Sequence, residues 1–268
     1  MELRYSIFDP TGNITALVET AVEPVRRQEA AAVVMRLHPE VEQVGFVRDA
    51  ASDGLPELNM AGGEFCGNAS MCAAALFALQ SGGCGKVRLH VSGAAQPVEV
   101  LLQALGADSF QTELRMPPAL EITERDFSFE DLHGTLPLVR MEGISHLAVE
   151  EASPFFALLR EKPQAERAVR QFCAELRADG LGLLFLEGEG TEHRMTPLVF
   201  IPGSGTVFWE NSCASGSAAV GMYLAARDAL PMEVSLREPG GILHVTSDLT
   251  GTLLRSSVRL MANHTVGI

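Results

Sequence analysis

Two cysteines stand in matching surroundings in the first and second halves of this chain of 268 residues. Cys66 lies in "MAGGEFCGNASMCAAALFAL" and Cys213 in "ENSCASGSAAVGMYLAA", so small residues and then an alanine-rich run follow each thiol. The alanine-rich runs predict helices that begin beside the cysteines. The first turn of a helix has free N–H groups and the positive end of the dipole. We therefore expect each thiol to have a lowered pKa and each helix start to bind an anion such as a carboxylate.

The repeated arrangement suits proton transfer at a carbon next to a carboxylate. A single cysteine at a helix start is more often a small core residue, but two in matching contexts favour a shared function. If the two halves pack around a pseudo-twofold axis, both helix starts point into one cleft, with a thiol on each side of the bound anion. Racemisation needs this geometry, because a base removes the α-proton from one face while an acid protonates the other. Such a pair would titrate as a coupled unit.

The composition limits the class of protein and its partners. The chain is 47% hydrophobic with a mean hydropathy of +0.15, enough for one large or two smaller domains. A net charge of −14 argues against nucleic acid or an anionic membrane as a partner. The start "MELRYSIFDP" does not resemble a signal peptide, and no apolar run reaches the roughly 18 residues of a membrane span. We expect a cytoplasmic protein whose partner is a small molecule.

The remaining chemistry-bearing residues indicate neither a metal nor a cofactor. Five cysteines without C-x-x-C spacing predict neither a disulfide framework nor a structural zinc site. The chain has only two lysines, Lys86 and Lys162, and both lie in turn-like surroundings. A pyridoxal-phosphate enzyme needs a lysine in its site for the Schiff base. We therefore expect no cofactor.

The order of predicted elements is similar in the two halves. Helices are expected after Pro24 and after Pro163, the second ending at Gly180. A polar, proline-led stretch over residues 117–134 reads as a crossing between domains. The expected strands cover residues 3–8, 14–19, 41–47, 87–91, 98–102 and 110–116, then "PLVRMEG", "SHLAVEE", "LGLLFLEG" and "MTPLVFIPG", and finally residues 234–268, broken by "EPGG".

The cysteine segments resemble a known family. "FCGNASMCA" and "SCASGSAA" are similar to the two cysteine motifs of diaminopimelate epimerase and its relatives, the cofactor-independent amino-acid racemases. The resemblance implies that Cys66 and Cys213 are the catalytic acid–base pair. It also implies that backbone N–H groups hold the substrate carboxylate, although alanine at the first of the two later positions replaces the family's usual glycine. These N–H groups belong to Gly67, Asn68, Ala214 and Ser215.

Further motifs extend the resemblance along the chain. "DPTGNITALV" is similar to the family's N-terminal glycine–asparagine turn and implies that Asn13 contacts substrate. "EQVGFV" resembles the strand with the substrate glutamine, here Gln43, and "LNMAGGEFCGN" retains an asparagine, Asn59, before the first cysteine. "MEGISHLAV" stands where the family has a turn with a histidine, so His146 joins the implied site. "REPGGILHV" resembles the family's late proline–glycine–glycine turn.

The resemblance also implies a fold. It is an α/β (α+β) fold of two pseudo-symmetric domains, each a curled, mostly antiparallel sheet around a central helix, as in diaminopimelate epimerase. The first domain would comprise residues 1–118 with a closing strand at 256–268, and the second residues 119–255. Because the family commonly forms homodimers, a homodimer is implied as well.

The residues that hold the far end of diaminopimelate are missing. The family uses a glutamate–arginine pair nine and eight residues before the second cysteine, where this chain has Ser204 and Gly205. An asparagine expected further upstream is replaced near Gly182. A distal carboxylate would thus lack its bidentate arginine, so we do not expect diaminopimelate to be the substrate.

The segment before Cys213 indicates another substrate. "FWENSCASGS" is closer to the histidine racemase branch of this superfamily. Trp209 would stack on a flat side chain, and Glu210 or Glu42 would pair with an imidazole or an ammonium group. The structural alternative, with Trp209 in the core and Glu210 as a solvated loop acid, has equal weight.

Other functions remain open on the sequence alone. Diaminopimelate epimerase itself, a thiol-redox protein with a switching disulfide, and a binding protein that holds a carboxylate without turnover are the alternatives. An isomerase of the phenazine-biosynthesis type works with a carboxylate base, so the retained thiols count against it. We interpret Cys72 and Cys173 as core thiols and Cys84 as a turn residue, and assign no role to the histidines other than His146.

Overall fold

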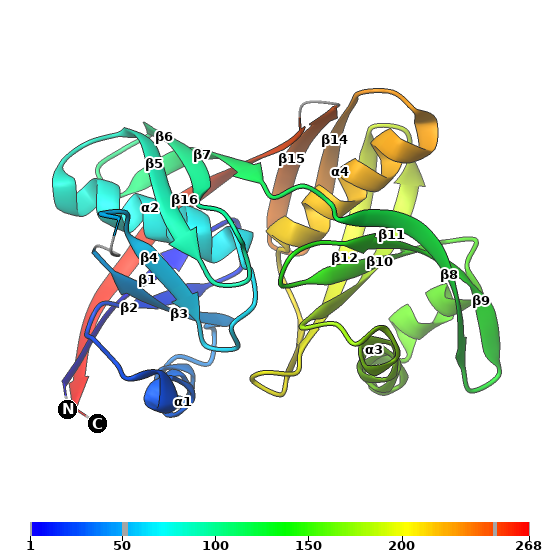
Figure 1. Cartoon of the computed structure of the whole chain (residues 1–268), viewed down its shortest axis with the longest axis horizontal. Coiled ribbons are helices and arrows are strands. Elements are labelled where there is room, and N and C mark those ends of the chain that lie inside the picture. Colours follow the sequence, from blue (N-terminus) through cyan, green and yellow to red (C-terminus); the bar gives the residue numbers. More distant parts are fainter. Residues whose placement is uncertain (1, 50–52, 249–250, 268) are drawn as a thin grey trace.

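The computed structural model describes residues 2–49, 53–248 and 251–267. Its strands follow one continuous path that curls into two sheets, which lie side by side in Figure 1. The pairs β2–β3, β4–β5, β10–β11 and β12–β14 are parallel, and the other described pairs are antiparallel. The fold is thus mixed α+β and rich in sheet.

The first sheet closes on itself as an eight-stranded barrel. Its strands follow the chain from β1 to β7, and β16 then pairs with both β7 and β1. Closure leaves no free edge among the described strands of this sheet. The strands are β1 (Glu2–Asp9), β2 (Thr15–Val18), β3 (Gln43–Arg48), β4 (Glu57–Met60), β5 (Gly85–Val91), β6 (Val98–Ala104), β7 (Ser109–Met116) and β16 (Gly251–Gly267).

The second sheet shares β16 with the first. From β16 it runs through β15, β14, β12, β11, β10 and β9 to β8, and β13 pairs with the other side of β12. Among the described strands, β8 pairs only with β9, so this sheet stays open. Its strands are β8 (Glu121–Phe129), β9 (Leu132–Arg140), β10 (Ser145–Glu150), β11 (Leu181–Glu189), β12 (Glu192–Ile201), β13 (Thr206–Trp209), β14 (Met232–Glu238) and β15 (Gly241–Asp248).

Two helices lie inside the curled sheets and two outside. The inner helices are α2 (Gly67–Ser81), which contacts most strands of the barrel, and α4 (Ala214–Asp228), which packs on β14, β15 and β16. Helix α2 is built of alanine and other apolar residues on every side and is buried almost throughout, as a helix surrounded by sheet must be. The outer helices α1 (Arg27–Leu37) and α3 (Lys162–Leu176) each cover one sheet (Figure 1).

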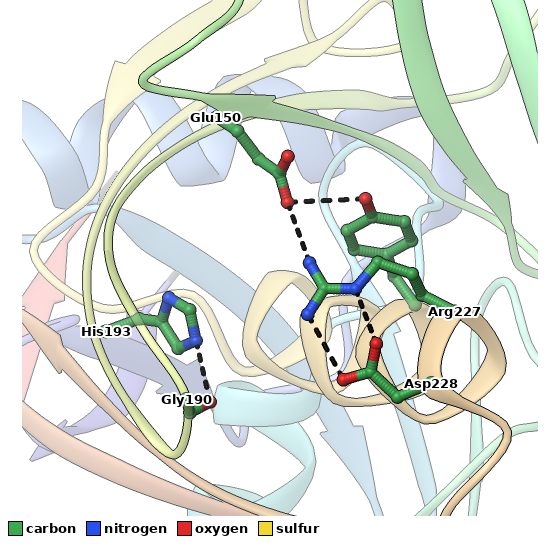
Figure 2. Close-up of polar contacts among 6 residues, drawn as sticks. Glu150, Gly190, His193, Arg227 and Asp228 are labelled. Carbon is green, nitrogen blue, oxygen red and sulfur yellow. Dashed lines mark hydrogen bonds and ion pairs between the residues drawn. The ribbon is translucent and has the colours of Figure 1, made fainter.

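A cluster of charged side chains fixes the end of α4 that lies away from Cys213. Figure 2 shows Arg227 between Asp228, with Nε–Oδ1 at 2.8 Å, and Glu150 of β10, with Nη1–Oε1 at 3.3 Å. The Tyr223 hydroxyl donates to the same Glu150 oxygen at 3.3 Å. These groups are partly exposed, so the ion pairs orient the helix more than they stabilise the fold.

The structure confirms the predicted order of elements and corrects three details. The stretch over residues 117–134 is not a crossing, because β8 and β9 form an antiparallel hairpin there, with Phe127 and Phe129 packed in the core. Helix α3 ends before Gly180, since Arg177 caps it in the left-handed conformation at φ 52°. The short strands β4 and β13 were not predicted. No helix of the described residues is both long and apolar enough to cross a membrane.

Candidate active site

Each of the two cysteines caps an inner helix. Cys66 precedes α2 in an extended conformation (φ −130°, ψ 111°), and its Sγ accepts the N–H of Ala69 at 3.4 Å. Cys213 precedes α4 at φ −127° and ψ 97°, and its Sγ accepts the N–H of Gly216 at the same distance of 3.4 Å. Each thiol therefore lies over the first turn of its own helix, among the N–H groups that have no partner within the helix.

The two helix N-termini meet at the contact between the sheets. A Cβ atom added to Gly67 would lie 2.9 Å from the Cβ of Ala214, so only glycine allows this approach. The Asn68 side chain crosses the contact and donates from Nδ2 to the Ser212 carbonyl at 2.9 Å. Both thiols line one narrow cavity of about 20 Å³ between these N-termini.

Most of the predicted site residues line this cavity. The structure brings together both cysteines, the four residues that follow them, one glutamine and one glutamate. They are Gln43, Cys66, Gly67, Asn68, Glu210, Cys213, Ala214 and Ser215. Gln43 donates from Nε2 to Oε1 of Glu210 at 2.7 Å, which ties β3 of the barrel to the loop before Cys213. Glu210 is buried, so it is not a solvated loop acid.

Asn13 lies behind the cavity. Its Nδ2 donates to Oε2 of Glu42 at 2.7 Å, and Asn211 donates to the same carboxylate through its backbone and side chain. The two predicted turns also touch here, because a Cβ on Gly12 would lie 2.5 Å from Cα of Gly240. Asn13 thus acts on the site through Glu42, which lines a neighbouring cavity.

His146 also lies behind the cavity, under the start of α4. Its ring is fully buried, and Nε2 lies 3.1 Å from Oγ of Ser215, which in turn lies 3.7 Å from Sγ of Cys213. Burial lowers the pKa of His146 to about 3, so the imidazole is neutral at ordinary pH. Gly182 faces the ring across the β10–β11 pair, where any side chain would collide with it. This explains glycine at 182, where the family resemblance suggested asparagine.

The structure separates two further residues from the site. Asn59 alternates with the buried Leu58 and Met60 along β4 and faces a hollow between β3 and the segment before α1, not the thiols. The expectation that Asn59 contacts substrate does not fit this position. Trp209 stacks on Phe185 at 5.8 Å between ring centroids and lines neither cavity, so its structural interpretation holds.

The surroundings reverse the expected effect on the thiols. Burial raises the pKa of Cys66, and the carboxyl groups of Glu210 and Glu64 raise it further. Burial also raises the pKa of Cys213, with Glu210 and Glu238 as the neighbouring carboxyl groups. The prediction of lowered pKa values is therefore wrong, because desolvation outweighs the helix N–H groups at both thiols. The pKa of Glu210 itself is raised to about 8 by burial.

Two buried glutamates were missed by the sequence reasoning. Glu64, two residues before Cys66, lines the thiol cavity. Glu238, at the end of β14, accepts the N–H of Cys213 at 2.6 Å and the hydroxyl of Ser217 at 2.5 Å. An acidic residue beside a predicted buried helix start was the available signal for Glu64. Glu238 stands in the motif "REPGGILHV", but its contact with Cys213, 25 residues earlier in sequence, forms only through the sheet.

A second, larger cavity adjoins the first. It has a volume of about 140 Å³ and extends between α1, β3 and β12. Several residues line both cavities, namely Gln43, Glu64, Val199, Ile201 and Glu210. None of the described residues that line them is a lysine or an arginine. The described residues contain no cluster of histidine, cysteine and acidic side chains arranged to bind a metal ion.

Comparison with known proteins relates this arrangement to amino-acid isomerases. A family profile described as the histidine racemase CntK N-terminal domain matches residues 2–266. The histidine racemase of Fusobacterium nucleatum subsp. nucleatum is 28% identical over 227 residues, which cover 81% of this chain and 78% of that protein. The histidine racemase of Staphylococcus aureus is 26% identical over 253 residues, which cover 91% of this chain and 88% of that protein.

A solved structure extends the comparison to the fold. A hydroxyproline epimerase from Agrobacterium vitis, with bound trans-4-hydroxy-L-proline, superposes with a TM-score of 0.70 at 15% identity. The match covers 99% of this chain and 91% of the epimerase. At this identity the likeness shows the fold alone.

Proposed function

Because the chain belongs to the histidine racemase family and is an amino-acid racemase, we propose that histidine is its substrate and that two thiols invert the α-carbon without a cofactor. The observation that carries the proposal is the pair of helix-capping cysteines, Cys66 and Cys213, on one cavity. The two cysteines cap helices that lie inside different sheets, so a molecule bound between them would have one sulfur on each side.

The helix N-termini supply the binding site for the substrate carboxylate. The N–H groups of Gly67 and Asn68 belong to the first turn of α2, and those of Ala214 and Ser215 to the first turn of α4. A carboxylate between them meets the positive ends of two helix dipoles. The same N–H groups stabilise the negative charge that spreads onto the carboxylate when the α-proton leaves.

The proton transfers balance within the thiol pair. One cysteine, as thiolate, takes the α-proton from one face, and the electron pair of the C–H bond moves toward the carboxylate. The other cysteine, as thiol, gives its proton to the opposite face of the carbon. The product has inverted configuration and the two sulfurs have exchanged protonation states, so the reverse reaction starts from the opposite assignment.

The acidic surroundings give the substrate ammonium a role. Without ligand, burial and the neighbouring Glu210 keep the pKa of both thiols high. An ammonium group beside Glu210 compensates this negative charge, so it favours the thiolate. Substrate binding thereby activates the base that attacks it.

The lining of the two cavities favours histidine over diaminopimelate. Among the described residues that line them, Glu42, Glu64 and Glu210 are the only ionisable side chains besides the cysteines. A distal carboxylate would have no cationic partner there and would meet like charge. An imidazole ring offers an N–H donor and is the better match.

We also propose that the fold is a pseudo-symmetric one of the diaminopimelate epimerase type. Residues 1–118 with the strand 256–268 would form one domain and residues 119–255 the other. The repeated order around α1 and α2, and around α3 and α4, supports this division. A homodimer and a cytoplasmic location stay predictions, which sedimentation of the purified protein and cell fractionation test.

The function is tested by α-proton exchange in deuterium oxide, followed by proton NMR on the reduced protein. The panel holds L-histidine, D-histidine and LL-diaminopimelate, with Cys66→Ser and Cys213→Ser as variants. We expect loss of the histidine α-proton signal with inversion, and a rate of inversion reduced about 10²–10⁴-fold in each variant. Binding of histidine without exchange would contradict the proposal and leave a carboxylate-binding protein.

A further inference from the structure

Two residues that line the cavities have a buried polar atom without a hydrogen-bond partner among the described residues: Asn68 at the thiol cavity, through Oδ1, and Glu64, which lines both cavities. Glu64 is 8% exposed, and its Oε2 is buried without a hydrogen-bond partner among the described residues. A buried acceptor left unpaired costs free energy, so such atoms in folded proteins call for an explanation. Burial also raises the pKa of this carboxyl group.

The other polar side chains around the larger cavity are occupied. Glu42 accepts from Asn13 and Asn211, and Glu210 accepts from Gln43. The remaining side chains bond within their own loops or to a nearby carbonyl: Gln28 donates to the Gly203 carbonyl, and Ser204 pairs with Thr206. Glu64 therefore offers a free hydrogen-bond acceptor to the larger cavity, whose described lining includes no lysine or arginine.

The free oxygen lies toward the larger cavity. A Cβ on Gly62 would come within 2.6 Å of Glu64 Oε2, and Gly62 lines the larger cavity but not the one that holds the thiols. The glycine thus leaves the carboxyl group room beside the backbone. An amino acid with its α-carbon between the thiols would extend its side chain into this larger space, past Glu64.

We infer that Glu64 binds the side-chain nitrogen of the substrate and selects amino acids whose side chain donates a hydrogen bond. The inference rests on the proposed function for the position of the α-carbon. It assigns Glu64 to the substrate ring and leaves Glu210, which contacts Gln43 and lies near Cys213, to the α-ammonium group. The apolar wall opposite, with Ala31, Ala32 and Met35 of α1, suits the carbon edge of an aromatic ring.

The test compares two amino acids that differ in the ring N–H. L-Histidine and 3-(2-thienyl)-L-alanine have rings of similar size, but thiophene donates no hydrogen bond. For each, kcat/KM of α-proton exchange is measured with wild-type protein, Glu64→Leu and Glu64→Gln. Glu29→Gln, on the exposed side of α1, is the control with the same change of charge.

We expect Glu64→Leu to lower the preference for histidine over thienylalanine about ten- to a hundredfold, with a smaller loss in Glu64→Gln, which keeps an acceptor. The control should leave the preference unchanged. Damage to the fold would lower both rates together, so only the ratio reports the inferred contact. An unchanged ratio in both Glu64 variants, with active wild-type protein, would overturn the inference and leave the proposed function intact.

Absence of exchange in wild-type protein would instead remove the proposed function. The inference is then tested alone, by calorimetric measurement of the binding of the same two amino acids to wild-type protein and to Glu64→Leu. A histidine preference that falls in Glu64→Leu supports it, and equal loss of binding for both amino acids overturns it.

Discussion

The start of α2 and the start of α4 share their backbone geometry but differ in what lies behind them. Cys66 and Cys213 have nearly the same backbone angles, and each accepts the N–H three residues on at 3.4 Å. Behind Cys213 the buried carboxyl of Glu238 takes up its N–H and the Ser217 hydroxyl. At the first helix, the Ser70 hydroxyl donates to the Cys66 carbonyl at 2.7 Å instead.

The difference shows that the position of each sulfur atom and its protonation state are set by different residues. Capping places each sulfur, and it follows from small residues at the start of a helix. The protonation of each sulfur follows from carboxyl groups that other elements supply: Glu210 near both thiols, Glu64 near Cys66 and Glu238 near Cys213. The two thiols thus occupy equivalent positions at their helices but have different neighbouring carboxyl groups.

The largest expected effect is on racemisation, and it distinguishes the two thiols by the enantiomer from which each removes the α-proton. Cys66→Ala and Cys213→Ala should each lower racemisation of histidine about 10²–10⁴-fold, because one face of the carbon loses its acid or base. Each variant should still exchange the α-proton of one enantiomer with retention, and the two variants should retain opposite enantiomers. Exchange is followed by NMR and configuration by chiral chromatography. If both variants lost α-proton exchange of the same enantiomer, the thiols would not face each other. Cys84→Ala, at an exposed cysteine, is the control.

The next effect tests the support behind each helix start. Glu238→Ala leaves the Cys213 N–H without its acceptor and should cost about 1–3 kcal/mol in the free energy of unfolding. Ser70→Ala removes a single hydroxyl bond and should cost about 0.5–1.5 kcal/mol. Urea unfolding at about pH 6 measures both. Glu238→Gln, which keeps an acceptor, should lie near wild type, and equal losses in Glu238→Ala and Ser70→Ala would remove the contrast.

A pH-dependent effect concerns the carboxyl group near both thiols. The pKa of Glu210 is about 8 in the folded protein, above its value of about 4.3 in an unfolded chain. Its contribution to stability is therefore full below about pH 4 and is lost as the pH rises to 8, by up to about 1.4 kcal/mol per pH unit. Glu210→Gln, which keeps an acceptor for Gln43, should raise the melting temperature at pH 8 and leave it nearly unchanged at pH 4. A shift of the same size at both pH values would contradict the raised pKa.

The smallest effect concerns Trp209. Trp209→Phe keeps the stacking on Phe185 and loses the hydrogen bond from Nε1 to Glu166, so stability should fall by about 0.5–1.5 kcal/mol. The KM and kcat for histidine should not change, because this side chain lines neither cavity. A raised KM would place the indole beside the substrate ring and reopen the stacking interpretation.

The sequence was informative where local pattern decides the structure. Small residues after Cys66 and Cys213 predicted both helix starts, and alternating apolar residues predicted most strands, since these signals act over a few neighbours. The sequence did not reveal the hairpin of β8 and β9, because β8 has few buried residues: only Phe127 and Phe129, at the end of the strand, are buried. The side of the sheet on which the Asn59 side chain lies depends on the register of β4, and this strand was too short to be predicted.

The pKa values of the thiols were beyond local reasoning. They depend on how deeply the two halves bury the cavity and on Glu238, which comes from another strand. The helix dipole alone would have given the opposite sign. Specific contacts across the two sheets, such as Asn68 to the Ser212 carbonyl, likewise appear only when the halves are packed together.

The shared strand β16 has a consequence for synthesis on the ribosome. The barrel closes through pairs such as Glu2 with Gly267, so its last strand is made after the whole second sheet. Until then β1 to β7 form an open sheet, and α2 lacks the strand that covers one of its apolar sides. The nascent first half therefore waits, with part of its core exposed to water and chaperones, for a segment translated more than a hundred residues later.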